Sequence, residues 1–271
     1  MTLRWMIFAV VAVLMTCAAQ AETMRMAVTT SFHNSGLAEV LLPRITQETG
    51  IEVQLLVVGT GQALKLGQAG DVDAILVHSK AAEEVFVAKG YGTHRREIMY
   101  NDFVLIGPED DPAGVKDAAT VAEALQKIAQ TRPAFVSRGD DSGTHRRELA
   151  LWASAGVDVT DASPDWYRAA GAGMGATLNT AVGMGAYVLS DRATWLKFGN
   201  KAGQAILFEG DAALFNQYAY LPVSPQLHAH VAHDSAQRVE EWLTSAAGQT
   251  MIGDYQIAGT RLFVPNARAR E

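Results

Sequence analysis

The chain carries its clearest structural signal in one stretch, Ser137-Arg138-Gly139-Asp140-Asp141-Ser142-Gly143-Thr144-His145. The apolar segment before it, Pro133 to Val136, is typical of a short buried strand. The segment after it, Arg146 to Trp152, predicts a helix with Leu149 and Trp152 on its buried side. The stretch is therefore interpreted as the turn between a strand and a helix.

Several groups in this turn can donate hydrogen bonds to a ligand. Asp141 or Ser142 would cap the helix, whose first backbone N–H groups have no partner inside the helix and whose dipole end is positive. Gly143 would let the backbone approach a ligand, and Ser142 and Thr144 offer hydroxyls. Arg138 adds a permanent cation with a planar fork of donors. These groups predict a socket for a small anion, and the alternative is an ordinary capped helix with a surface arginine.

Composition limits the partners that such a socket can have. The chain has 271 residues, of which 49% are hydrophobic, so it can build one large or two smaller cores. Its formal net charge of −7 argues against nucleic acid and anionic membranes as partners. The same charge repels anions, so any bound anion must be held by local geometry.

The N-terminus resembles a secretory signal. An apolar run from Trp5 to Met15, too short to span a bilayer, precedes an A-x-A cleavage sequence at Ala19-Gln20-Ala21. We expect residues 1–21 to be a signal peptide and the mature protein to be periplasmic. A lipoprotein anchored through Cys17, the single cysteine, is the alternative. Cleavage after residue 21 would leave no thiol for a disulfide, a nucleophile or a metal site.

Three other turns lead from a strand or a loop into a helix. They lie at Thr29 to Gly36, at Gly59-Thr60-Gly61 and at Gly171 to Leu178. The second fails as a dinucleotide fingerprint because Leu64 stands where a small residue is needed. The third matches G-x-G-x-x-A but follows no convincing strand. Backbone approach to a small anion explains these glycines equally well.

The four turns divide into two pairs around a charged break at Glu109 to Gly114. A long extended segment, Ile98 to Pro108, leads into this break, and a second extended segment, Tyr218 to Val223, would return the chain. We therefore expect an α/β protein of two lobes, with the ligand in the cleft between them. The expected lobes are residues 22–107 with 216–271, and residues 108–215.

One cluster of histidines suggests a metal site. His228, His230 and His233 are close in sequence, but no carboxylate pattern completes the ligand set. The interpretation is therefore solvated polar residues, and neither a metal cation nor a cofactor is expected.

Taken together, these motifs resemble the periplasmic tungstate-binding proteins of ABC importers. The resemblance covers nearly all of the chain after residue 21. It is carried by Thr29-Thr30-Ser31 with Ser35-Gly36-Leu37, Val58 to Leu64, Gly70 to Asp73, Met99 to Val104, Ser137 to Asp140 with Ser142 to His145, and Gly173 to Asn179.

The resemblance implies the type II periplasmic binding protein fold and a receptor that captures tungstate and delivers it to a membrane permease. It implies no enzymatic activity, no nucleic-acid partner and a monomer. The ligand-binding residues that it implies are Thr29, Thr30, Ser31, Thr60, Arg138, Ser142, Gly143, Thr144, Met174 and Gly175.

Two alternatives remain open at this point. Molybdate, sulfate or phosphate could be the anion, and a protonatable anion such as phosphate would favour an acceptor such as Asp140 or Asp141. A secreted hydrolase could use Ser142 or Ser137 as nucleophile with His145 as base. The chain has no G-x-S-x-G motif and no carboxylate clearly placed to orient that histidine.

Overall fold

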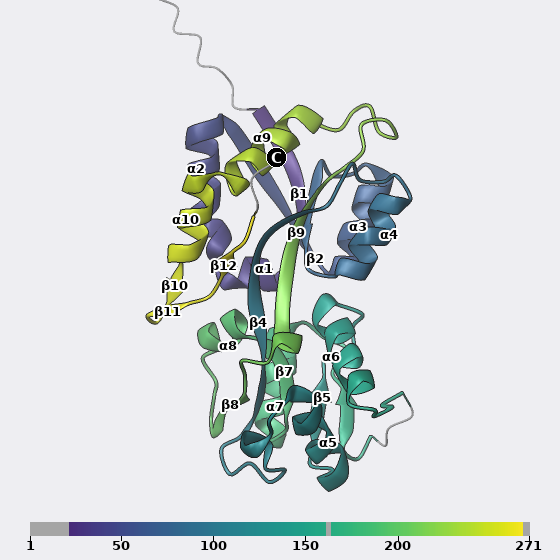
Figure 1. The fold of residues 1–271 in the computed structure, drawn as a ribbon, viewed down its shortest axis with the longest axis vertical. Helices are drawn as coiled ribbons and strands as arrows, with labels where there is room; N and C mark the ends of the chain where they lie inside the picture. The colour runs from purple at the N-terminus through teal and green to yellow at the C-terminus, as the bar shows by residue number, and fades with distance from the viewer. Residues whose placement is uncertain (1–21, 161–163, 268–271) are drawn as a thin grey trace, which may run out of the picture.

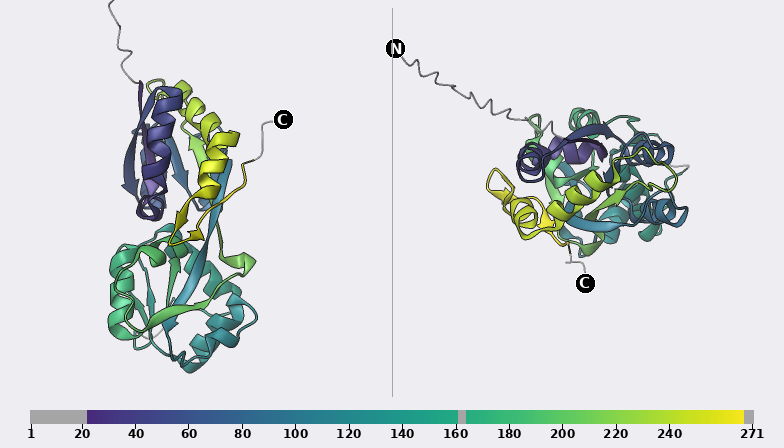
Figure 2. Two further views of the ribbon diagram at one scale, coloured as in Figure 1. Left: turned by 90° about the vertical axis from the view of Figure 1, so that its left-hand side faces the viewer. Right: turned by 90° about the horizontal axis from the view of Figure 1, so that it is seen from above.

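Two α/β lobes lie end to end along the long axis of the molecule, and the long strand β4 passes from one into the other (Figure 1 and Figure 2). The computed structural model describes residues 22–160 and 164–267. The expected signal peptide, residues 1–21, lies outside the described residues. Within the described residues, no helix has the length and apolar character needed to cross a membrane.

The elements follow the expected alternation of strands and helices. The first lobe contains β1 (Glu22–Thr29), α1 (Thr30–Ser35), α2 (Leu37–Thr49), β2 (Ile51–Val58), α3 (Thr60–Ala69), β3 (Ala74–Val77), α4 (Lys80–Ala88), β9 (Phe215–Pro222), α9 (His233–Thr244), α10 (Ala246–Asp254), the hairpin β10 (Gln256–Ile257) and β11 (Thr260–Arg261), and β12 (Val264–Pro265). The second lobe contains α5 (Val121–Thr131), β5 (Phe135–Ser137), α6 (Gly143–Ser154), β6 (Tyr167–Ala169), α7 (Met174–Met184), β7 (Val188–Asp191), α8 (Arg192–Lys197) and β8 (Gln204–Phe208). Strand β4 (Arg96–Pro108) belongs to both lobes.

The sheet of the first lobe has the order β12-β4-β9-β3-β1-β2. Strand β1 pairs parallel with β2 and with β3, whereas β9 runs antiparallel to β3 and to β4. Because β1, β2 and β3 are parallel, their carboxyl ends meet at one edge, where helices α1, α3 and α4 begin. That edge faces the second lobe (Figure 1).

Alternation along buried strands builds two cores in each lobe. In β4, Phe103 and Leu105 join the core beneath α5 and α6, while Val104 and Ile106 join the core beneath α7. Successive side chains of a strand point to opposite faces, so a continuous apolar run can be buried on both. Strand β3 does the same in the first lobe, with Leu76 in the core of α2 and α9 and Ile75 in the core of α3.

Strand β4 changes its pairing partner midway along its length. Its first half pairs with β9, ending at the pair Asp102 and Phe215. Its second half, from Phe103 onward, pairs with β7 and β8. The chain therefore leaves the first sheet and enters the second within one continuous strand.

Two local expectations from the sequence were wrong. Leu149 is 40% exposed, and the residues of α6 that are buried around Trp152 are Glu148 and Leu151. The sequence showed no convincing strand before the turn at Gly171 to Leu178, but strand β6 lies there and pairs in parallel with β5. Only three residues long, it has too few positions to show alternation in the sequence.

Candidate anion-binding site

Hydroxyls at the carboxyl end of β1 form a connected group. Thr29 caps α1, its Oγ1 accepting from the N–H of Phe32 at 3.3 Å, and lies 3.0 Å from the Oγ of Ser31. The Ser31 Oγ is 3.1 Å from both the Tyr218 hydroxyl and the Nε2 of His78. Thr29 and Ser31 are buried, whereas Thr30 is partly exposed on α1. The structure thus joins the turn at Thr29 to Gly36 to β9 through Tyr218, and to the end of β3 through His78.

The turn after β5 in the second lobe is built as a tight loop. Gly139 and Asp141 both adopt positive φ, at 63° and 57°. A Cβ on Gly139 would lie 2.6 Å from the Cβ of Ala169, so this position needs glycine for space as well as for conformation. Ser142, one of the two caps that the sequence allowed, caps α6 by accepting from the N–H of His145 at 3.2 Å.

Arg138 is buried and paired. Its side chain is 5% exposed, and its Nε and Nη2 donate to Oδ2 of Asp140 at 3.0 and 2.8 Å. Both nitrogens share one carboxylate oxygen, so the pair is not the two-oxygen fork typical of the strongest arginine contacts. Beneath this turn, Glu148 accepts from the Tyr167 hydroxyl at 2.6 Å, and burial raises the pKa of Glu148 to about 7.

The turns of the two lobes touch at Gly143. A Cβ on this residue would lie 2.5 Å from Cε1 and 2.9 Å from Nδ1 of His78, and 3.1 Å from Oγ1 of Thr60. Thr60 is the first residue of α3 and His78 directly follows β3, so both belong to the first lobe. The absence of a side chain at Gly143 is what allows this approach.

Four buried polar atoms around this contact have no hydrogen-bond partner among the residues that the structure describes. They are Thr60 Oγ1, His78 Nδ1, Asn101 Nδ2 and Thr144 Oγ1. Asn101 belongs to β4, where its Oδ1 accepts from Asn216 of β9 at 2.8 Å, so these atoms come from both lobes and from the strands between them. Buried polar groups nearly always have partners, and three of these four are donors. The arrangement can therefore receive a ligand rich in acceptor oxygens.

The electrostatics of His78 favour its neutral form. Its pKa is lowered to about 4, mainly by burial, with the positive charges of Arg138 and Arg147 acting in the same direction. Its ring packs against Tyr218 and Phe103, with centroid distances of 4.8 and 6.3 Å. The sequence interpretation missed His78 and Asn101. His78 follows a recognisable strand, so it could have been found as the residue at the carboxyl end of the third parallel strand.

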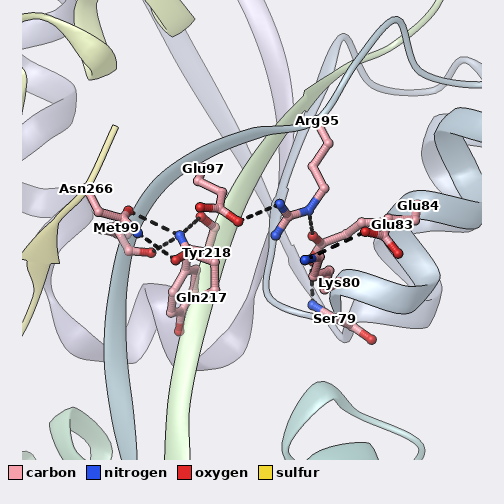
Figure 3. Close-up of polar contacts among 10 residues, drawn as sticks. All are labelled: Ser79, Lys80, Glu83, Glu84, Arg95, Glu97, Met99, Gln217, Tyr218 and Asn266. Atoms are coloured by element: carbon pink, nitrogen blue, oxygen red, sulfur yellow. Dashed lines mark hydrogen bonds and ion pairs between the residues drawn. The ribbon is translucent and has the colours of Figure 1, made fainter. Parts of the chain in front are cut away.

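A buried ion-pair network supports the turn that carries His78 (Figure 3). Glu83 of α4 accepts from the N–H of Ser79 at 2.5 Å and from Nε of Arg95 at 2.7 Å, and Arg95 also binds Glu97 at 2.9 Å. Burial raises the pKa of Glu83 to about 7, and Arg95 opposes that rise. On the other side of β9, Gln217 donates to the carbonyls of Met99 and Tyr218 (Figure 3).

The N-terminus of α7 lies against the Arg138 turn. The N–H of Ala170 donates to the Ser137 carbonyl at 2.8 Å, and that of Ala172 to the Arg138 carbonyl at 3.4 Å. Met174, the first residue of α7, has its side chain buried in the core, so only its backbone can serve a ligand. Gly175 has open space around its Cα. Helix α7 has no side-chain cap, which leaves its first N–H groups available.

The hydrolase geometry is not formed. The Ser142 Oγ accepts from the backbone of His145, and the His145 ring accepts from the N–H of Asp141 at 3.0 Å, so the two side chains are not paired. Nor do the described residues contain a group of three or more His, Cys, Asp or Glu placed to hold a metal. His228 and His230 instead bind the carbonyls of Gln68 and Gly70 at the end of α3.

Comparisons with known proteins agree with this architecture. The model of the PBP superfamily domain matches residues 16–247. A tungstate-binding protein TupA of Peptoclostridium acidaminophilum is 46% identical over 246 residues, which cover 89% of this chain and 85% of that protein.

Solved structures agree as well. The tungstate-binding protein TupA of Desulfovibrio alaskensis G20 superposes with a TM-score of 0.82 at 47% identity, over 92% of this chain and 100% of the other. The structure described as the tungstate ABC transporter from Geobacter sulfurreducens gives a TM-score of 0.79 at 47% identity, over 86% and 99% of the two chains. The chain therefore belongs to the PBP superfamily and, within it, to the TupA family of tungstate-binding proteins.

Proposed function

We propose that this protein is the solute receptor of an ABC importer, that it binds tungstate between its lobes and that it delivers the anion to a membrane permease. The observation that carries the proposal is the set of buried polar atoms without partners, Thr60 Oγ1, His78 Nδ1, Asn101 Nδ2 and Thr144 Oγ1. An oxyanion offers several acceptor oxygens and no donors, which matches this set. The relatives named as tungstate-binding proteins support the choice of anion.

The proposed contacts fall into three groups. Hydroxyl and amide donors come from Thr60, Thr144 and Asn101, and the cationic contact is Arg138. Backbone N–H groups come from the first turns of the helices that begin at Gly143 and Met174, including Gly175. Ser142 caps α6 and therefore shapes this turn through its side chain. Thr29, Thr30 and Ser31 complete the first wall, and Ser31 orients His78 through Nε2.

The carboxylates near the site favour an anion that carries no proton. Asp140 is paired with Arg138, and both oxygens of buried Asp191 accept from Thr194, at 2.9 and 2.7 Å. Both carboxylates already accept hydrogen bonds from protein donors, and this disfavours phosphate, whose second pKa lies near neutrality and whose remaining proton would need an acceptor. Tungstate, molybdate and sulfate are fully deprotonated dianions at neutral pH and meet the same donors.

We also propose a revised division of the chain into lobes. The sequence placed the first crossing at residues 107–108, but pairing of β4 with β9 ends at Asp102 and Phe215. We therefore assign residues 22–102 and 216–267 to one lobe and 103–215 to the other, with hinges at these two points.

We propose that residues 1–21 are cleaved as a signal peptide and that the mature protein is released into the periplasm as a monomer. The measured mass of the exported protein tests the position of this cleavage.

Calorimetric titration of the mature protein with tungstate, molybdate, sulfate and phosphate tests the proposed function. We expect tight binding of tungstate, weaker binding of sulfate and no binding of phosphate. Tighter binding of phosphate or sulfate than of tungstate would reject the proposal. Hydrolysis of generic ester substrates, lost in Ser142→Ala, would support the enzyme alternative instead.

A further inference from the structure

A groove opens between the lobes beside the proposed site. It has a volume of about 350 Å³ and is lined from the first lobe by the start of α4 and from the second lobe by α6. The lining residues are His78, Ser79, Lys80, Ala81, Ala82, Gly143, Arg146, Arg147 and Ala150. His78 and Gly143 also border the buried polar atoms of the site, so the groove reaches the edge of the site.

The groove is positively charged in an acidic protein. Three of its lining residues, Lys80, Arg146 and Arg147, are cations, and none of the described residues that line it is a carboxylate. Arg147 donates to the backbone carbonyl of Phe215 at 2.7 Å and has no carboxylate partner among the described residues. Arg146 is paired with Asp141, which lies outside the lining, so its charge is partly offset.

Lys80 is the cation of the groove that is most available to a ligand. Its contact with Glu84 is long, at 3.9 Å, and both side chains are mostly exposed, so this pair contributes little. The residue opens α4, whose Ncap residue Ser79 provides no side-chain cap. Glu83 in this turn accepts from the N–H of Ser79 and partly offsets the positive end of the helix, while the other first-turn N–H groups add to the charge of the lysine.

We propose that this groove is an outer binding site for the same class of tetrahedral oxyanion, which is held there transiently on its way into and out of the buried site. The inference rests on the proposed function. A protein of net charge −7 repels a dianion at long range, so a local positive groove at the mouth of the site would raise the rate of capture. The cations of the groove contribute to the path of the anion and not to the final complex.

Rapid-mixing measurements with tungstate, followed by intrinsic fluorescence at low and at high ionic strength, test the inference. The variants are Lys80→Gln and Lys80→Glu, with Lys80→Arg as the conservative replacement. Lys89→Glu is the matched control, because Lys89 is exposed at the other end of α4 and outside the groove.

We expect the association rate constant to fall by about 2–10-fold in Lys80→Glu at low ionic strength, within the range of electrostatic steering, and the difference to shrink at high ionic strength. The dissociation rate constant should fall by a similar factor, because the outer site lies on the path in both directions. Lys80→Arg should keep the wild-type rates.

Two results would overturn the inference while leaving the proposed function intact. Equal association rates in Lys80→Glu and Lys89→Glu would show only an effect of net charge. A weaker equilibrium affinity of Lys80→Gln, with unchanged association, would place Lys80 in the final complex. Failure of the wild-type protein to bind tungstate in the equilibrium titration would instead reject the proposed function itself, and the outer site with it.

Discussion

Substitution of Arg138 separates its proposed ligand role from its structural role in the turn. Arg138→Ala should weaken tungstate binding by about 2–4 kcal/mol, the range for truncating one partner of a buried charged pair. Arg138→Lys should lose less, because a point charge remains while the planar fork is lost. Calorimetry of both variants measures the loss.

The control for the Arg138 variants is a substitution of Asp140, the partner of Arg138 in the turn. Asp140→Asn keeps the size of the side chain and removes a negative charge beside the anion. We expect it to lower the thermal stability of the ligand-free protein while changing tungstate affinity less than Arg138→Ala does. If Arg138→Ala destabilises the ligand-free protein and leaves the affinity near the wild-type value, Arg138 only shapes the turn.

Glu148 makes the stability of the second lobe depend on pH. Burial raises the pKa of this carboxyl to about 7, above its unfolded value near 4.5, so the folded state binds the proton more tightly. The stabilisation is fully present below pH 4.5, falls by up to about 1.4 kcal/mol per pH unit as the pH rises from 4.5 to 7, and stays lost above pH 7.

Glu148→Gln should remove this contribution. Thermal unfolding of the ligand-free protein between pH 5 and pH 8.5 should show a shallower decline below pH 7 in the variant than in the wild type, and similar slopes above it. The exposed Glu84→Gln is the control. Parallel curves for Glu148→Gln and the wild type below pH 7 would mean that the carboxyl is already ionised in the folded state at pH 5.

Substitution of Gly143, the first residue of α6, tests whether the two lobes must come into contact at this position for tungstate to bind. A Cβ there would lie 2.5 Å from the His78 ring, whereas a Cβ on Gly175, in the first turn of α7, would meet nothing within 4 Å. Gly143→Ala should therefore keep the helix, since alanine favours it, but hold the lobes apart and weaken tungstate binding at least about tenfold.

Gly183→Ala is the matched control, because it makes the same change within helix α7, where a Cβ also meets nothing within 4 Å, and Gly183 lies outside the proposed contacts. Its affinity should stay within about twofold of the wild type. Calorimetry of the two variants compares them directly. Equal affinities would show that contact between α6 and the first lobe is not needed for binding.

For the molecule as a whole, we expect closure of the two lobes on the ligand. The proposed donors for the anion come from both lobes and from Asn101 between them, so only the closed form would complete the shell of the anion, and tungstate should favour it. Small-angle scattering should show a smaller radius of gyration with tungstate than without, and no change in Arg138→Ala at the same concentration. An unchanged wild-type radius would exclude closure but not binding.

Much of this architecture could be predicted from local sequence. Alternating apolar strands, the Ser142 cap and the glycines of the tight turn depend on interactions within a few residues, and the structure confirms these features. The two-lobed fold followed from the order of such segments and from the resemblance to a known family. Leu149 shows the limit, because helical periodicity gives the spacing of a buried face but not which face the neighbouring elements cover.

Only the tertiary structure decided which turns meet. Thr60, His78 and Gly143 are brought together by the order of strands in the first sheet and by the passage of β4 into the second lobe. Likewise, the pairing of Arg138 with Asp140, and not with Asp141, depends on the backbone path through Gly139. Backbone propensity acts over a few residues, whereas strand order and lobe contact depend on packing between segments far apart in the chain, and a single sequence does not display that packing.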